Sequence, residues 1–195
     1  MTFLPARKKA AYVILSLTLA TSAVDAEPLS GEAAGAMLFP ETGVSVELIP
    51  NDKLSRSVMK IIKAVAEQQP WYAAIALSPD EDLMTSPATV AGAQFHDTDA
   101  AATFALAGCE AKRTGASPCA VVALVRPKGW QARDLQLSLN ATEFFNATYQ
   151  PAPVPKALAT SAATGAFGFG AGGDAALADC QSKSAATDCR VVIAD

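Results

Sequence analysis

One short pattern occurs twice in this chain and limits the folds that it can adopt. Residues 105–122 read ALAGCEAKRTGASPCAVV, and residues 176–192 read ALADCQSKSAATDCRVV. Each copy contains Ala-Leu-Ala-x-Cys-x-x-Lys, a polar stretch, and then Cys-x-Val-Val. An Ala-rich run that ends near a cysteine, followed by a β-rich run that starts with one, indicates a helix and then a strand. The duplication therefore predicts two related strand–helix–strand units.

The first of these, unit 1, covers residues 71–130. The apolar run 71–77 predicts a buried strand, because a Ser-Pro-Asp turn signal follows it directly. Residues 90–95 form a looser, second candidate strand. Asp97 is the predicted N-cap of the Ala-rich helix, and the run 119–125 is a predicted central strand.

Unit 2 covers residues 156–195 and is shorter than unit 1 by about twelve residues in its middle. Residues 157–161 match the first strand of unit 1, Asp174 is the predicted helix cap, and residues 189–193 are the closing strand. In place of the missing residues stands the glycine-rich run 168–173, which we interpret as a flexible turn.

The rest of the chain supplies packing elements. The segment 27–70 contains apolar residues at helical spacing over 55–69, which predicts a core-packing helix. The connector 131–155 contains an alternating apolar–polar run at 135–139, which favours a half-exposed strand. We predict an α+β fold in which the two related units share one sheet, with an N-terminal packing helix, in a single globular domain over residues 27–195.

The four cysteines, Cys109, Cys119, Cys180 and Cys189, are equally distributed between the two units. Four cysteines allow three pairings. We favour the local pairs Cys109–Cys119 and Cys180–Cys189, because they let both units close in the same way, and each would contribute about 3 kcal/mol. Bridges between the units and free buried thiols remain the alternatives. A metal site is not predicted, since neither spacing is Cys-x2-Cys and the chain has one histidine.

The first 26 residues have the features of a secretory signal peptide. A basic group at positions 7–9 precedes the apolar run 13–23, and small residues close the stretch at 24–26. The run is shorter than the roughly twenty residues of a membrane-spanning helix, so an uncleaved anchor is the weaker alternative. Cleavage before Glu27 would leave 169 of the 195 residues, with no membrane span after cleavage, in the periplasm or outside the cell.

The charge of the mature chain argues against nucleic acid as a partner. The formal net charge of the whole chain is −4, and removal of three basic residues and one acidic residue with the leader makes it −6. Binding to phosphates requires a concentrated basic surface, and the one basic cluster belongs to the leader.

The strand at 72–76, the Ala-rich helix that ends at Cys109 and the strand at 119–122 resemble those of small exported alphaproteobacterial proteins of unknown function. The resemblance is good over residues 70–130 and weaker over 156–195. Relatives of this kind carry the label 5-aminolevulinate synthase, which implies pyridoxal phosphate held on a lysine. The mature chain is less than half the size expected of such a fold. None of its seven lysines lies in a recognisable cofactor motif, so we predict no cofactor.

Two patterns invite a site assignment and have simpler interpretations. Residues 168–173 fit G-x-G-x-x-G, yet the chain ends at Asp195 without the further βα units of a dinucleotide-binding sheet. His96 and Asp97 suggest a hydrolase triad, but no G-x-S-x-G elbow accompanies them and Asp97 is the predicted cap. We therefore predict no catalytic, cofactor-binding or metal-binding residues.

Composition and motifs together favour an exported, disulfide-stabilised, non-enzymatic binding or interaction module of the cell envelope. Its partner would be an envelope protein or a small ligand. The alternative is a small-molecule enzyme that uses acids such as Asp80 or Glu81 beside the aromatic pair Trp71 and Tyr72. A deep pocket that gathers carboxylates or His96 would favour the enzyme, and a flat apolar patch would favour a partner surface.

Overall fold

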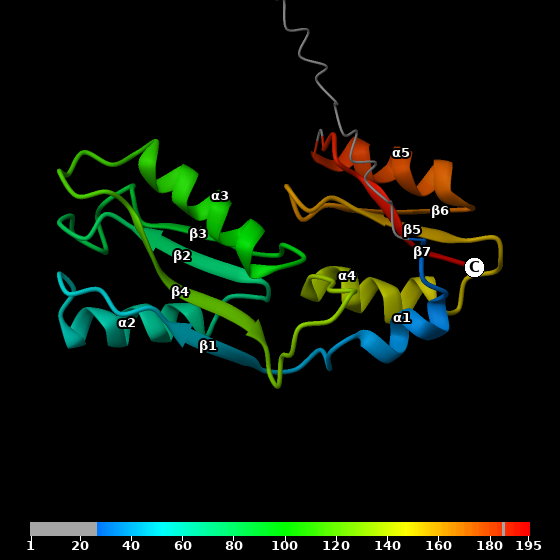
Figure 1. Cartoon of the computed structure of the whole chain (residues 1–195), viewed down its shortest axis with the longest axis horizontal. Coiled ribbons are helices and arrows are strands. Elements are labelled where there is room, and N and C mark those ends of the chain that lie inside the picture. The colour runs from blue at the N-terminus through cyan, green and yellow to red at the C-terminus, as the bar shows by residue number, and fades with distance from the viewer. Residues whose placement is uncertain (1–26, 185) are drawn as a thin grey trace, which may run out of the picture.

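The computed structural model of the chain describes residues 27–184 and 186–195 (Figure 1). The predicted signal peptide, residues 1–26, lies outside the described residues. In chain order the helices and strands are α1 (Gly31–Met37), β1 (Val44–Leu48), α2 (Arg56–Ala66), β2 (Ala73–Leu77), β3 (Val90–Gly92), α3 (Thr98–Glu110), β4 (Ala120–Pro127), α4 (Leu139–Phe144), a π-helical turn (Phe145–Tyr149), β5 (Ala157–Thr160), β6 (Phe167–Gly170), α5 (Gly173–Ser184) and β7 (Arg190–Ala194).

The strands form two separate antiparallel sheets, and with the helices they confirm the α+β class (Figure 1). One sheet has the order β1-β4-β2-β3 and the other the order β6-β5-β7. The prediction that the two units share one sheet is therefore wrong. The central strands β2 and β5 each pair on both sides within their own unit. The outer edge of β4 is covered by β1 and that of β7 by a bridge to Leu29, so these edges are not available to join the units.

Unit 1 (β2, β3, α3, β4) and unit 2 (β5, β6, α5, β7) have the same connectivity. In each, the first strand is central, the second pairs antiparallel on one side, and the third pairs antiparallel on the other side after the helix. Each central strand has a register shift, between Ile75 and Ala76 in unit 1 and between Leu158 and Ala159 in unit 2. These positions correspond when the two sequence copies are aligned. A common origin of the units stays a proposal.

Each unit is closed by its own disulfide, as the local pairing predicted. Cys109 is bonded to Cys119 with a Cα–Cα distance of 6.1 Å, and Cys180 to Cys189 with a distance of 6.2 Å. Cys109 on α3 and Cys180 on α5 are fully buried. Each bridge therefore links the inner face of a helix to the start of the strand that follows it.

Helices cover both faces of each sheet. Successive residues of β2 point to opposite faces, so Ile75 packs with Ile62 of α2 while Ala76 packs with Ala105 of α3. The predicted N-terminal packing helix is present as α2, and Ser55 is its N-cap. In unit 2, α5 covers one face, and α1, α4 and the π-helical turn cover the other (Figure 1).

The glycine-rich run of unit 2 is not mainly a turn, which corrects its interpretation. Gly168 and Gly170 belong to β6, where α5 lies almost against the strand backbone. A Cβ atom at Gly168 would lie 2.1 Å from the amide nitrogen of Cys180, and one at Gly170 would lie 2.4 Å from the Cβ of Ala175. Only Gly172, with φ of +102°, has the backbone conformation that favours glycine in this run. The glycines mainly permit close packing of strand and helix.

Candidate ligand pocket between the two units

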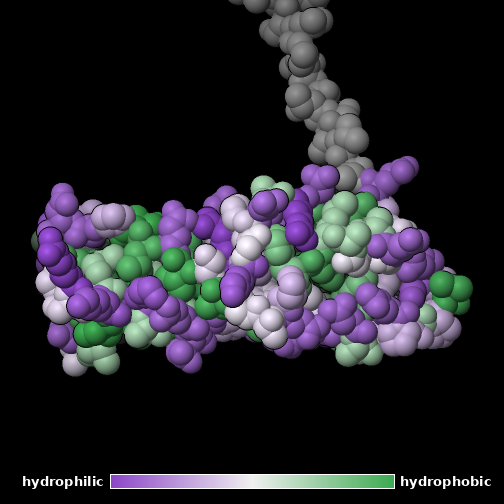
Figure 2. Space-filling model, turned by 90° about the horizontal axis from the view of Figure 1, so that it is seen from below, coloured by the Kyte–Doolittle hydropathy of each residue, from purple (hydrophilic) through white to green (hydrophobic). Residues whose placement is uncertain are grey.

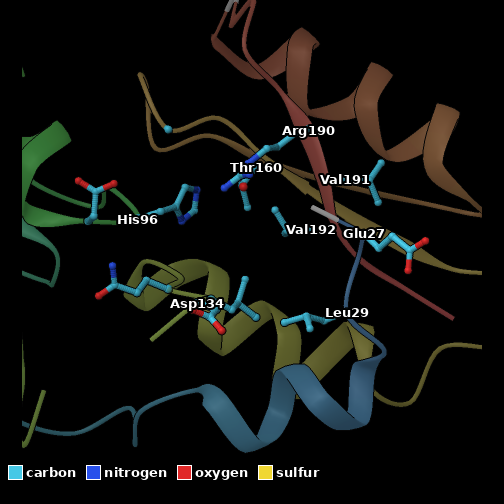
Figure 3. A pocket seen from close by; sticks show the side chains of 12 residues that line it. Glu27, Leu29, His96, Asp134, Thr160, Arg190, Val191 and Val192 are labelled. Carbon is cyan, nitrogen blue, oxygen red and sulfur yellow. The ribbon is translucent and has the colours of Figure 1, made fainter. Parts of the chain in front are cut away.

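A cavity of about 340 Å³ lies where unit 1, unit 2, the connector and the N-terminal segment meet (Figure 3). Its lining combines charged, polar and aliphatic side chains. The lining residues are Glu27, Leu29, His96, Asp97, Asp134, Leu135, Gln136, Thr160, Ala162, Arg190, Val191 and Val192. The volume lies at the lower end of the range of known small-molecule sites.

His96 forms part of the pocket wall, but both of its ring nitrogens are used in hydrogen bonds that hold the units together. Its Nδ1 accepts a hydrogen bond of 3.1 Å from the backbone N–H of Ser138 in the connector. The ring is thus the Nε2–H tautomer, and Nε2 donates to the carbonyl of Ala166 in unit 2 at 3.2 Å. Burial lowers the pKa of His96, although the bond to Ala166 and the charges of Asp97 and Asp188 act in the opposite direction. A neutral imidazole whose two nitrogens are both hydrogen-bonded to backbone has a structural role, and here it joins unit 1 to the connector and to unit 2.

Asp97 also has a structural role, because it is the N-cap that the sequence predicted. Its Oδ1 accepts a hydrogen bond of 2.7 Å from the backbone N–H of Ala100 and caps α3. The predicted capping role therefore accounts for the His96–Asp97 pair without a triad.

Three other charged side chains of the pocket are free to meet a ligand. Within the part of the chain that the structure describes, Glu27, Asp134 and Arg190 form no salt bridge and no side-chain hydrogen bond. Arg190 begins β7, where it is paired in register with Thr160 of β5, and Asp134 lies in the connector. Sequence reasoning missed all three, because an isolated charged residue at a strand start or in a linker has no motif.

The acids proposed for an enzyme hold loops together. Asp80 accepts hydrogen bonds from the backbone N–H groups of Ala116 and Ser117, and Glu81 accepts them from those of Thr114 and Gly115. These bonds tie the β2–β3 loop to the loop that leads into the disulfide of unit 1.

The same acids lie far from the aromatic pair. Trp71 and Tyr72 precede β2 and are both 1% exposed, whereas Asp80 and Glu81 follow it. At about 3.3 Å per residue, the five residues of β2 alone separate the two groups by about 16 Å. The enzyme alternative that joins these acids to the aromatic pair is therefore wrong.

A second surface feature is an apolar groove on unit 1. It has a volume of about 210 Å³ and is lined mainly by α2 and the loop between β2 and β3. Ile61, Val65 and Met84 in this lining are 43%, 45% and 74% exposed. Figure 2, which views the molecule from below, shows hydrophobic surface among hydrophilic residues on the half that contains α2.

Three further findings bear on the class of protein. Over residues 27–184 and 186–195, no three His, Cys, Asp or Glu side chains are grouped so that they could hold a metal ion. Among the described helices, none is both long and apolar enough to cross a membrane. Family models, curated proteins and solved structures were compared with the chain, and none matches. The resemblance to small exported proteins thus stays a prediction.

Proposed function

We propose that the protein is an exported binding protein of the cell envelope, without catalytic activity, that takes a small ligand in the pocket between its two units. Export is supported by the basic and apolar leader sequence before Glu27. The two disulfides agree with an oxidising compartment.

One observation carries the binding assignment. The pocket combines unpaired charged side chains with aliphatic walls, whereas His96 and Asp97, the acid–base pair suggested by the sequence, already have structural roles. A general base must be able to reach a proton of the substrate, but both nitrogens of His96 are bonded to backbone. Binding needs only the free charges and the cavity, so it is the activity that this arrangement supports best.

The test is a thermal-unfolding screen of the mature protein against sugars, organic acids, amines, amino acids and nucleotides. A ligand at about 100 times its Kd stabilises a protein by about 2.7 kcal/mol, which for a chain of this size raises Tm by about 5–10 °C. Ala162→Trp fills the pocket from an exposed position and should abolish the shift. Ala178→Trp on the exposed side of α5 is the control. No shift with any compound, or a shift unchanged in Ala162→Trp, would refute the pocket as the site.

A partner protein bound at the apolar groove is the second candidate, because Met84 and its two neighbours on α2 expose large apolar side chains side by side. Such patches often mark interaction surfaces. A pull-down from envelope extracts with the wild type and with Met84→Ser tests it. A partner that is retained equally by both proteins would rule out the groove.

A further inference from the structure

We propose that the ligand of this pocket is a small zwitterion of the amino-acid or short-peptide class. Its carboxylate would bind at Arg190 and Thr160, its ammonium at Asp134, and its apolar part against the aliphatic wall. This inference rests on the proposed function, because it names the ligand class of the same pocket.

The carboxylate position follows from a cross-strand pair. Thr160 and Arg190 face each other in the register of β5 and β7, and both side chains line the pocket. Directly opposed residues have Cβ atoms about 5 Å apart, which allows one carboxylate to contact both side chains. Figure 3 shows the two side chains next to each other, on the same side of the pocket. A guanidinium and a hydroxyl are both donors, and a guanidinium can bind a carboxylate through two parallel hydrogen bonds.

The ammonium position follows from the remaining charges. Asp134 enters from the connector, on the opposite side of the pocket from Arg190 in Figure 3. Glu27, Asp97 and Asp134 supply three negative charges and Arg190 supplies one positive charge, so the side chains of the lining have a formal charge of −2. The α-ammonium group that cleavage before Glu27 would create adds one positive charge, and the lining of the mature chain stays negative. This net negative charge would repel a simple organic acid, and Arg190 is the one cationic side chain of the lining that a phosphate ester could bind.

The wall between these two ends is aliphatic. Leu29, Leu135, Val191 and Val192 belong to the lining. In Figure 3, Val192 lies between Arg190 and Asp134, and Leu29 lies beside Asp134. The remaining volume suits one or two apolar side chains rather than a large cofactor.

The experiment compares one zwitterion with its two halves. L-Leucine is titrated calorimetrically into the mature protein beside 4-methylpentanoate, which lacks the ammonium, and 3-methylbutylamine, which lacks the carboxylate. The dipeptide Ala-Leu and L-lysine are titrated as additional zwitterions. We expect at least one zwitterion to bind about tenfold or more tightly than either half-ligand, since each charged end contributes a charge-assisted hydrogen bond.

Two variants assign the ends. Arg190→Gln should weaken binding of the zwitterion about tenfold and leave 3-methylbutylamine unchanged, whereas Asp134→Asn should weaken the zwitterion and the amine but not the acid. Arg56→Gln, at an exposed position at the start of α2, is the matched control. Equal affinity for a half-ligand, or full affinity in Arg190→Gln, would overturn the assignment.

The outcomes also separate this inference from the proposed function. If no zwitterion binds at millimolar concentration but another compound of the thermal screen binds and is lost in Ala162→Trp, the pocket is a binding site for a different class and the zwitterion assignment is wrong. If nothing binds, both are wrong.

Discussion

Units 1 and 2 have the same strand connectivity, yet their helices lie at different distances from the sheet. In unit 1, a Cβ atom at Gly92 of β3 would lie 2.8 Å from the carbonyl oxygen of Ala101 on α3. In unit 2, a Cβ atom at Gly168 of β6 would lie 2.1 Å from the backbone of α5. The second helix thus packs closer to its strand. The three atoms nearest to the Cβ position of Gly168 are all backbone atoms, whereas near Gly92 one backbone atom and two side-chain atoms are closest. A shared connectivity therefore does not imply a shared tolerance to substitution.

In both units, hydrogen bonds to an acidic side chain join the loop between the first two strands to the loop after the helix, and we call these contacts loop ties. The acid lies on the first of these loops in unit 1 and on the second in unit 2. In unit 1 the acid Glu81 lies on the loop between the first two strands and binds amides of the loop after the helix. In unit 2 the acid Asp188 lies on the loop after the helix and binds the Ser161 hydroxyl and the Ala163 amide before β6. The loops are joined in both units although the residues that join them are not equivalent in the repeat.

Glycine substitution should give the largest difference between the units. Gly168→Ala must displace α5 and should lower the free energy of unfolding by about 3 kcal/mol or more, the upper end of the overpacking range. Gly92→Ala, with a wider gap, should cost about 1–2 kcal/mol. Urea unfolding measures both. Gly35→Ala in α1 meets only ordinary contacts and serves as the control. If Gly168→Ala is no less stable than Gly92→Ala, α5 is not closer to its sheet than α3.

Removal of the disulfides should affect the two units almost equally. The bridges join residues 10 and 9 positions apart, so the loop-entropy model assigns each of them about 2.6 kcal/mol. The paired Ser variants of Cys109 with Cys119, and of Cys180 with Cys189, should therefore have similar urea midpoints. A clear difference would show that packing around the bridge, rather than loop closure, determines its contribution.

His96 connects the two units, and its loss should cost about 2 kcal/mol. His96→Ala would leave the buried N–H of Ser138 without its partner, whereas the carbonyl of Ala166 would keep the hydrogen bond that it accepts from the backbone N–H of Ser161. His96→Gln retains one acceptor and one donor and should be less destabilised. Chemical unfolding at pH 8 compares the three proteins. If His96→Ala has the same free energy of unfolding as the wild type, the hydrogen bonds of His96 do not contribute to stability.

The same residue predicts a dependence of stability on pH. Because burial lowers the pKa of His96 in the folded state, the unfolded chain takes up the proton first as the pH falls. The contribution is complete above about pH 6.5, the pKa of the unfolded chain, and falls below it by at most about 1.4 kcal/mol per pH unit until the folded pKa is reached. His96→Gln should lack this loss between pH 6.5 and pH 5. The same slope in both proteins would assign the effect to other groups.

Local features of this fold were predictable from the sequence. The cap at Asp97, the helix α2 and the disulfide pairs each depend on residues close together in the chain, and the structure contains all of them. The spacing of apolar residues and the position of turn signals are sufficient for such elements.

The features that were not predictable depend on distant partners. Leu135 and Leu137 alternate as in a strand, yet no strand of the described chain includes them, and they are buried in the core of unit 2 beside Phe145. Gly168 belongs to β6, where it is paired with Ala159 of β5, and α5, which follows in the chain, packs against its backbone. The pocket brings together Thr160, Arg190 and Asp134, which carry no common motif.

The smallest predicted effect is the stability that the loop ties of Glu81 and Asp188 lose at low pH. Hydrogen bonds from the Ser86 hydroxyl and from the Gly115 and Thr114 amides lower the pKa of Glu81. Burial raises the pKa of Asp188, but bonds from Ser161 and Ala163 lower it overall. Since both pKa values lie below those of the unfolded chain, the stability that these acids provide is present above about pH 4 and is lost as the pH falls through the folded values.

Glu81→Gln and Asp188→Asn compare the two ties directly. Glu81 accepts two backbone hydrogen bonds and Asp188 accepts one, so Glu81→Gln should lower the urea midpoint at pH 7 more than Asp188→Asn does. As the pH falls from 7 to 3, the difference between each variant and the wild type should become smaller, because the stability that the carboxylates provide is lost as the pH falls toward their folded pKa values. Glu143→Gln, at an exposed position on α4, should match the wild type at both pH values. If the two variants differ from the wild type as much at pH 3 as at pH 7, the loop ties do not depend on the charge of the acids. It then makes no difference to stability in acid which of the two loops carries the acid.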